Sequence, residues 1–175
     1  MVEFDVAEIG RLVVNGLAAE ARQRGLELRL SCDPALPRLV RGDPRRLRQI
    51  LTNLAMNALK FTERGHVELR LERAAHDDAR VHLLAAVSDT GIGIAPQDLE
   101  RIFEPFTQLA ASHARRFAGV GLGLAIVRDL VHAMGGTIEV TSTPGAGTTF
   151  RCHLPLAPQQ RHEAAAAQPA AEREV

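Results

Sequence analysis

The sequence predicts an α+β fold in two layers: one mixed, mostly antiparallel sheet, covered on one face by three helices. Three segments repeat apolar residues at spacings of three and four, which is typical of amphipathic helices. Five segments alternate apolar and polar residues, which is typical of half-buried strands. The order helix, strand, helix, hairpin, helix, hairpin favours a two-layer sandwich.

Local start and stop signals bound most of these elements. Asp43 and Pro44 are a favourable N-cap and first helical residue, and Gly25, Gly65 and Gly135 end the three helices. The third helix is apolar nearly all round and is therefore expected to be buried. The expected elements are helix 5–24, strand 26–30, helix 43–62, strands 67–71 and 81–87 as a hairpin, short helical turns within 96–106, helix 122–134, and strands 138–140 and 148–154.

Composition divides the chain into one domain, residues 1–155, and a tail. Residues 156–175 are rich in Ala, Gln and Pro, so we expect a disordered tail or linker there. A hydrophobic content of 46% supplies a core for the domain.

Charge and residue usage exclude several classes of function. The formal net charge is zero and aromatic residues make up 3%, which argues against a nucleic-acid partner. Two cysteines exclude a disulfide scaffold and a four-cysteine zinc site. No apolar run approaches the roughly 20 residues of a membrane span, and residues 1–10 lack a secretory signal core. We therefore expect a cytoplasmic domain without direct membrane contact, at most the cytosolic part of an anchored protein.

The predicted helix 43–62 carries a polar stripe beside its apolar stripe. Gln49, Asn53, Asn57 and Lys60 recur at spacings of four, four and three, so their side chains project together. Lys60 is the single lysine among 21 basic residues. The stripe is either a solvated face or a site where asparagine oxygens coordinate a hard cation such as Mg²⁺ and Lys60 meets a phosphate.

Asp89 lies two residues after the predicted strand 81–87 and is in phase with the apolar residues of that strand, so it is expected to point toward the core. A buried carboxylate requires hydrogen-bond donors. Asp89 is thus either a satisfied turn residue or an acceptor for a ligand donor such as an exocyclic amine. Gly91 and Gly93 would allow the backbone to approach that ligand closely.

Glycines also open the third predicted helix. Gly119, Gly121 and Gly123 expose backbone N–H groups at a helix N-terminus, where anions are favoured. The spacing departs from the dinucleotide fingerprint and no strand directly precedes it, which disfavours a Rossmann site. Thr148, in phase with Phe150, points its hydroxyl inward, as an ordinary strand threonine also would.

The order of these patterns along the chain is more specific than any one of them. RLRQILTNLAMNALKFT, SDTGIGIAP, FEPF and GVGLGLAI resemble, in this order, the N, G1, F and G2 boxes of bacterial sensor histidine kinases. GGTIEVTSTPGAGTTF closes the domain as in that family, which belongs to the GHKL ATPase superfamily. The resemblance covers residues 4–155, is greatest to hybrid-type kinases, and implies a Bergerat-type fold that binds ATP and Mg²⁺.

The resemblance also implies a role for each motif residue. Asn57 is the expected magnesium ligand, Asn53 its partner in the N box, and Lys60 a phosphate contact. Asp89 is expected to accept a hydrogen bond from the adenine amino group, and Thr148 to support the same region. The other expected nucleotide contacts are Phe61, Gly91, Gly93, Ile94, Gly119, Gly121, Leu122, Gly123 and Leu124.

Residues 107–120 are expected to form the ATP lid of the family. Within it, Arg115 is expected to approach the outer phosphates as a catalytic residue, together with Asn53, Asn57 and Lys60. The family often has Gly-Gly-Thr-Gly where this chain has AGVG at residues 118–121. Val120 offers no hydroxyl to a phosphate and Ala118 limits backbone freedom, so both changes bear on lid affinity and closure.

One residue of the N box distinguishes kinases from ATPases that hydrolyse ATP. Relatives that hydrolyse ATP, such as gyrase and the heat-shock chaperones, carry Glu one turn before the metal Asn. Asn53 stands there in this chain, and an amide is no general base. The resemblance thus implies a protein-histidine kinase that donates the γ-phosphoryl group to a histidine on a separate phosphoacceptor domain, with a response regulator or receiver domain as the next partner.

The sequence holds no segment like that acceptor motif, so we expect the isolated domain to be a monomer that needs the acceptor domain for autophosphorylation. Two alternatives stay open. One is a self-contained GHKL ATPase, and the other is a degenerate module that binds a nucleotide or a partner without activity.

Overall fold

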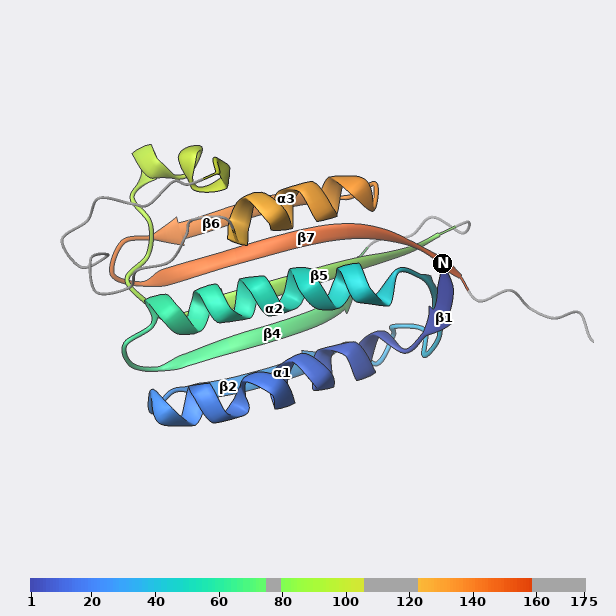
Figure 1. Cartoon of the computed structure of the whole chain (residues 1–175), viewed down its shortest axis with the longest axis horizontal. Coiled ribbons are helices and arrows are strands. Elements are labelled where there is room, and N and C mark those ends of the chain that lie inside the picture. The colour runs from blue at the N-terminus through green and yellow to red at the C-terminus, as the bar shows by residue number, and fades with distance from the viewer. Residues whose placement is uncertain (75–79, 106–122, 159–175) are drawn as a thin grey trace, which may run out of the picture.

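The computed structural model describes residues 1–74, 80–105 and 123–158. Within them the chain folds as an α+β sandwich, as predicted (Figure 1). The elements are β1 (Val2–Phe4), α1 (Val6–Gln23), β2 (Glu27–Cys32), β3 (Val40–Gly42), α2 (Pro44–Phe61), β4 (His66–Arg73), β5 (Val81–Asp89), the 3₁₀ turns η1 (Pro96–Asp98) and η2 (Arg101–Phe103), α3 (Gly123–Ala133), β6 (Thr137–Thr143) and β7 (Gly147–Pro158).

The described strands form one mixed sheet in the order β1-β3-β7-β5-β4-β2, with β6 also paired to β7. Only β2 and β4 pair in parallel among them, and the other pairs are antiparallel. The predicted hairpins β4–β5 and β6–β7 are confirmed. The long strand β7 pairs with β5 on one side and with β6 and β3 on the other, so it organises the sheet.

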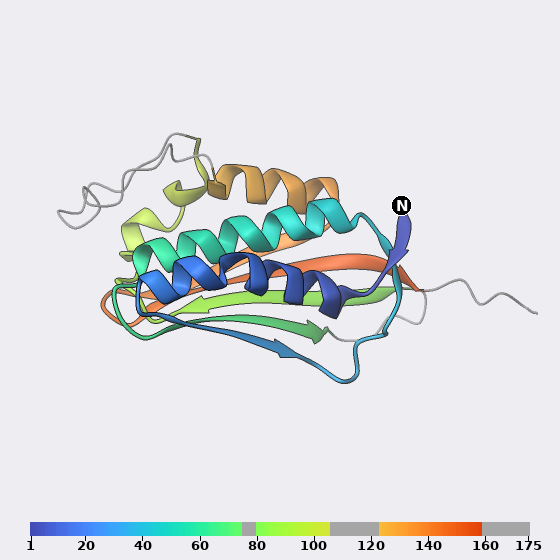
Figure 2. The same cartoon turned by 60° about the horizontal axis from the view of Figure 1, so that its bottom comes forward.

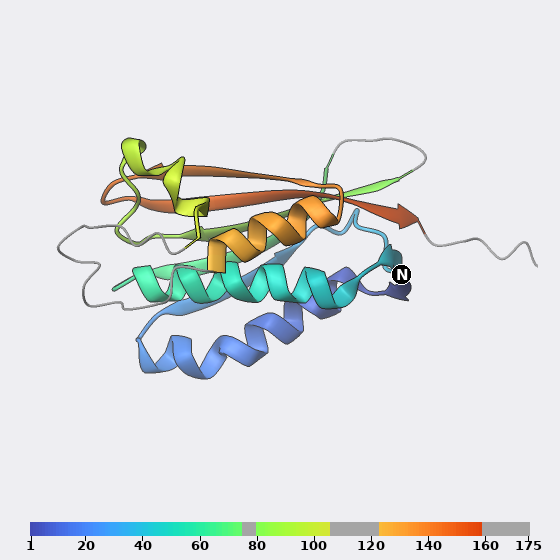
Figure 3. The ribbon, with the colours of Figure 1, turned by 45° about the horizontal axis from the view of Figure 1, so that its top comes forward.

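The three described helices cover one face of the sheet and leave the other face bare (Figure 2). Helix α2 lies between α1 and α3 (Figure 3) and contacts both. Its side chains Leu47, Ile50, Leu51 and Leu54 are fully buried. Burial of each such side chain contributes about 1.5–3 kcal/mol, so α2 is central to the core.

Both long helices begin at an aspartate whose side chain caps the helix. Asp5 Oδ1 accepts from the N–H groups of Ala7 and Glu8 at 2.8 and 3.2 Å. Asp43 caps α2 in the same way, and Pro44 is the first helical residue, as predicted. These caps satisfy N–H groups that have no partner within the helix.

Helix α3 differs from the expectation of a fully buried helix. Its buried residues are Ala125, Val127 and Val131, whereas the Ile126 side chain is 38% exposed. The helix lies at the margin of the helical layer, where it packs against α2, η2 and the strands β6 and β7. Apolar periodicity alone does not reveal that one flank of the helix has no neighbouring element among the described residues.

Strands at the sheet margin also differ from the prediction. The three-residue strands β1 and β3 were not expected, because they are too short to show an alternating pattern. Strand β7 continues to Pro158 rather than ending at Leu154, and Leu156 is only 2% exposed, opposite Val81. Residues 159–175 of the expected tail lie outside the described part of the chain.

Within the described residues, no helix combines the length and the apolar character needed to cross a membrane. Both cysteines in this part are free thiols. Cys152 is fully buried at the centre of β7, and burial raises the pKa of its thiol to about 12.

Candidate functional site

The polar stripe of α2 is present in the structure. Asn53, Asn57 and Lys60 are half-buried, whereas Gln49 is exposed. Helix α2 is regular along its whole length. Among the described residues, the side-chain amides of Asn53 and Asn57 have no hydrogen-bond partner. These amide oxygens are therefore available to a ligand from outside the protein.

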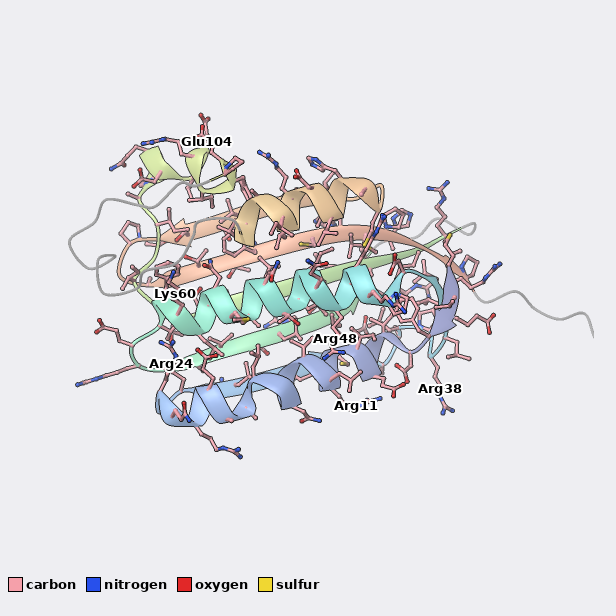
Figure 4. All side chains as sticks on the ribbon, in the orientation of Figure 1. Arg11, Arg24, Arg38, Arg48, Lys60 and Glu104 are labelled. Carbon is pink, nitrogen blue, oxygen red and sulfur yellow. The ribbon has the colours of Figure 1, made fainter. Side chains whose placement is uncertain are left out.

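Lys60 lies at the C-terminal end of α2 (Figure 4). Its Nζ is 5.1 Å from the ring centroid of Phe61, the distance of a cation–π contact. Partial burial lowers the pKa of the Lys60 ammonium from 10.5. A partly desolvated ammonium attracts an anion more strongly than one in bulk water, because the local dielectric constant is lower.

Asp89 ends β5 on the face of the sheet that carries the core, as its phase predicts. It pairs in register with Val67 of β4 and Thr148 of β7, which are both buried. Burial raises the pKa of the Asp89 carboxyl, while the N–H groups of Gly91 and Thr148 partly offset this shift. Asp89 Oδ1 accepts from the Gly91 N–H at 2.8 Å, and the carboxylate is held in place as an acceptor.

Thr148 points inward, as predicted, and is 7% exposed. Its Oγ1 is 2.8 Å from Oγ of Ser142 on β6. Ser142 Oγ also accepts from the Ile94 N–H at 2.7 Å, which ties the loop after β5 to the β6–β7 hairpin. The sequence analysis missed Ser142, although Ser142 is in phase with Ile138 and Val140 on β6 just as Thr148 is in phase with Phe150 on β7.

Gly91 and Gly93, in the loop after β5, are needed for close packing within the protein, whereas the sequence predicted that they allow close approach of a ligand. A Cβ on Gly91 would lie 2.3 Å from the Phe61 carbonyl oxygen. A Cβ on Gly93, whose φ is +70°, would lie 2.2 Å from the Thr143 carbonyl oxygen. Both glycines therefore allow backbone to pack on backbone within the protein, and their contact with a ligand stays a prediction.

These contacts bring the end of α2, the loop after β5 and the β6–β7 turn together. The Ile92 N–H donates to the Phe61 carbonyl at 3.2 Å, and the Gly145 N–H donates to the Ile92 carbonyl at 2.7 Å. A shallow groove opens at this end of the sheet. It is lined by Asp89, Thr141, Ser142, Thr143, Ala146, Gly147, Thr148 and Thr149.

Part of the predicted site lies at or beyond the start of α3. Gly123 is exposed, and among the described residues nothing lies within 4 Å of the position of a Cβ there. Leu124 packs against the core. The predicted lid 107–120, Arg115, Gly119, Gly121 and Leu122 lie outside the described residues, as do Ala118 and Val120.

The described side chains could supply only some of the ligands of a hard cation. No group of three or more His, Cys, Asp and Glu side chains gathers in the described segments. Amide oxygens such as those of Asn53 and Asn57 fit Mg²⁺, which commonly takes one or two protein ligands and completes its shell with phosphate oxygens and water.

Comparison with known proteins identifies the family of this domain. Residues 42–158 match the family described as histidine kinase-, DNA gyrase B- and HSP90-like ATPase. The chain belongs to this family. The family resemblance predicted from the sequence motifs is thereby confirmed.

Relatives of this ATPase domain are named as histidine kinases. Signal transduction histidine-protein kinase BarA of Escherichia coli (strain K12) is 45% identical over 144 residues, which are 82% of this chain and 16% of BarA. Sensor protein GacS of Pseudomonas syringae pv. syringae is 38% identical over 178 aligned positions, which cover 93% of this chain and 20% of GacS. The ATPase domain thus spans a fifth or less of each relative's length.

Solved structures of histidine kinases share the fold of this ATPase domain. Full-length ShkA in complex with AMPPNP superposes with a TM-score of 0.77 and 39% identity, over 90% of this chain and 31% of ShkA. The mycobacterial sensor histidine kinase MprB superposes with a TM-score of 0.68 and 28% identity, over 90% of this chain and 100% of that chain. The domain is thus of the histidine kinase type within its family.

Proposed function

We propose that this domain binds ATP with Mg²⁺ and donates the γ-phosphoryl group to a histidine on a separate phosphoacceptor domain, from which a receiver domain or response regulator takes it. Relatives that match most of the chain are named histidine kinases, and ShkA was solved with AMPPNP. The proposal places the domain in the cytoplasm, where ATP is supplied.

The observation that carries the proposal is the Asp89 carboxylate at the end of β5. Burial raises the pKa of this carboxyl, so keeping it ionised has a cost in free energy that the N–H groups of Gly91 and Thr148 only partly offset. A half-buried acceptor at a groove matches the exocyclic amino group of adenine, which is a hydrogen-bond donor. Perturbed carboxylates in grooves are more common at functional sites than elsewhere.

The polar stripe of α2 would serve the phosphate end of the nucleotide. Asn57 would hold Mg²⁺ through its amide oxygen, with Asn53 beside it, and Lys60 would bind phosphate through its partly desolvated ammonium. Bound Mg²⁺ supplies neutralisation of phosphate charge. Together these side chains would position the triphosphate and lower the charge repulsion between it and an incoming nucleophile.

Donation rather than hydrolysis follows from the chemistry of Asn53. In the transfer, an imidazole nitrogen of the acceptor forms a bond to the γ-phosphorus as the bond to the β–γ bridging oxygen breaks. ADP leaves with that electron pair, and the imidazole releases its N–H proton to solvent. No group must deprotonate a water, so an amide at position 53 is compatible with kinase chemistry.

Calorimetric titration of the whole chain with AMPPNP, with and without Mg²⁺, tests the binding step. We expect micromolar affinity that Mg²⁺ strengthens. A purified helical hairpin bearing the acceptor histidine, mixed with the domain and γ-labelled ATP, then tests transfer. Steady ATP turnover without the hairpin would instead support a self-contained ATPase. Absence of nucleotide binding at millimolar concentration would leave a partner-binding module.

A further inference from the structure

The hydroxyl of Ser142 lies at the centre of the site without being part of the predicted ligand set. Ser142 pairs in register with Thr148 across the β6–β7 hairpin. Its Oγ contacts three groups: the Ile94 N–H at 2.7 Å, the Gly147 carbonyl oxygen at 3.0 Å and Thr148 Oγ1 at 2.8 Å. A serine hydroxyl has one proton to donate and two lone pairs to accept with, so these contacts use its full capacity.

Only one arrangement of protons makes all three contacts hydrogen bonds. The Ile94 N–H must donate, and the Gly147 carbonyl oxygen can only accept, so the Ser142 proton points to Gly147. The 2.8 Å contact with Thr148 then requires the Thr148 hydroxyl to be the donor. The proton of Thr148 is therefore committed to Ser142, and its Oγ1 retains only lone pairs for other partners.

This commitment gives the side chains of Asp89 and Thr148 the same polarity. Thr148 lies opposite Asp89 in the β5–β7 register, and both line the groove. An ionised carboxylate has no proton to donate. The two side chains thus offer a ligand acceptors only. At position 6 of a purine, an amino group is complementary to these two acceptors, whereas a carbonyl oxygen adds a third acceptor.

We propose that Ser142 is a positioning residue that sets nucleobase selectivity, because it holds the Thr148 proton away from the groove and so favours 6-aminopurine over 6-oxopurine nucleotides. The inference rests on the proposed function, since it assumes that the base binds beside Asp89. It assigns Ser142 no contact with the nucleotide. Ser142 acts through Thr148 and, by its bond to Ile94, through the loop after β5.

The ratio of ADP to IDP affinity tests the proposal, because ADP presents an amino group at position 6 beside an unprotonated N1, whereas IDP presents a carbonyl oxygen there beside an N1–H. We expect the whole chain to bind ADP more tightly than IDP. In Ser142→Ala the Thr148 hydroxyl is free to rotate and to donate to a 6-oxo oxygen. The ratio should then narrow about threefold or more, within the range of one hydrogen bond. Ser142→Thr, which keeps the hydroxyl, should retain the ratio.

A matched control removes one hydroxyl of a similar pair, Ser88 and Thr149, whose side chains alternate with those of Asp89 and Thr148 along β5 and β7. Thr149 Oγ1 donates to Ser88 Oγ at 3.0 Å, one residue away from both Thr148 and Asp89. Ser88→Ala should leave the ratio unchanged. Thermal unfolding of each variant checks that it is folded. If Ser142→Ala compromises folding, Thr148→Val supplies the second test, because it removes the Thr148 hydroxyl itself and should narrow the ratio by lowering ADP affinity.

The outcomes separate this inference from the proposed function. If the unaltered chain binds neither nucleotide, the proposed function itself is wrong. If it binds ADP selectively but Ser142→Ala weakens ADP and IDP by the same factor, Ser142 has only a structural role and the inference is overturned. An unchanged ratio in both Ser142→Ala and Thr148→Val would also overturn it.

Discussion

Helices α1 and α2 are built alike but differ in what their open sides carry. Each has 18 residues, an aspartate N-cap and a buried apolar stripe. On α1, Glu20 forms an ion pair at 2.9 Å with Arg24, the residue that caps the helix C-terminus. On α2, the half-buried Asn53 and Asn57 have no hydrogen-bond partner among the described residues. The open side of α2 thus keeps half-buried polar groups available for a ligand.

The largest expected effect tests what the helices share. Leu54 of α2 is fully buried and Leu17 of α1 is 8% exposed. Truncation of either to Ala should lower the free energy of unfolding by about 2–5 kcal/mol, because it removes buried methyl groups and leaves a cavity. Denaturant unfolding monitored by circular dichroism measures both. A negligible loss for Leu17→Ala alone would mean that α1 does not serve the fold as α2 does.

A pair of asparagines sharpens the difference between the helices. Asn57→Ala should lower the Mg²⁺-dependent part of AMPPNP affinity roughly 10- to 100-fold, the range seen when groups that support a bound metal are removed. Metal-free nucleotide should still bind. Asn15→Ala, on the exposed side of α1, should change neither affinity nor stability. Calorimetric titration with and without Mg²⁺ decides, and an unchanged Mg²⁺ dependence in Asn57→Ala would place the metal elsewhere.

Asp89→Asn should weaken ADP and ATP alike by about 1–3 kcal/mol, because a buried acceptor is replaced by a partly mismatched amide. The same variant has a pH signature. The folded state raises the pKa of Asp89 above 3.8, so it holds that proton more tightly than the unfolded state does. The stability of the unaltered chain, relative to Asp89→Asn, should therefore fall as pH rises from below 3.8 through the raised pKa and then stay level.

Urea unfolding of both proteins across this pH range measures that difference. A relative stability that instead increases with pH would mean that the N–H groups of Gly91 and Thr148 outweigh the effect of burial. Equal nucleotide affinity in the two proteins would remove Asp89 from the adenine role.

The smallest effects concern two cations. Lys60→Gln should lower ATP affinity about 3- to 10-fold and leave adenosine affinity unchanged, since a partly desolvated point charge on the phosphates is lost. Arg24→Gln removes an exposed ion pair of α1 and should change stability by less than about 0.5 kcal/mol. Parallel titrations with ATP and adenosine provide the comparison. An equal loss for both ligands in Lys60→Gln would indicate a structural role.

Local signals predicted the elements that are themselves locally specified. The bounds of α1 and α2 agree with the prediction to within a residue or two, because Asp5, Asp43 and Pro44 determine the helix starts. The β1 and β3 strands could not be predicted, since three residues become a strand only through their partners. The exposed flank of α3 depends likewise on which elements lie beside it.

In the candidate site, too, residues within sequence motifs could be predicted, whereas contacts between distant segments could not. Motif order singled out Asn57, Lys60, Asp89 and Thr148 along the sequence. It did not reveal that the Ser142 hydroxyl joins Ile94 to Thr148, because this depends on the register of β6 against β7. Gly147 was also missed as a packing residue: its φ is +116°, and a Cβ there would lie 1.9 Å from the Asp89 carbonyl oxygen.

The buried thiol of Cys152 has a consequence for kinetics. With a pKa of about 12 and no exposed surface, this thiol is protonated and shielded in the folded domain at neutral pH. Alkylating reagents attack thiolates, so they modify Cys152 only when the strands around β7 separate. The rate at which Cys152 is modified therefore measures how often the strands around β7 separate. A bound ligand lowers the rate of Cys152 modification by the factor 1 + [L]/Kd. Cys152, unlike the partly exposed Cys32, therefore reports occupancy of the groove at the start of β7.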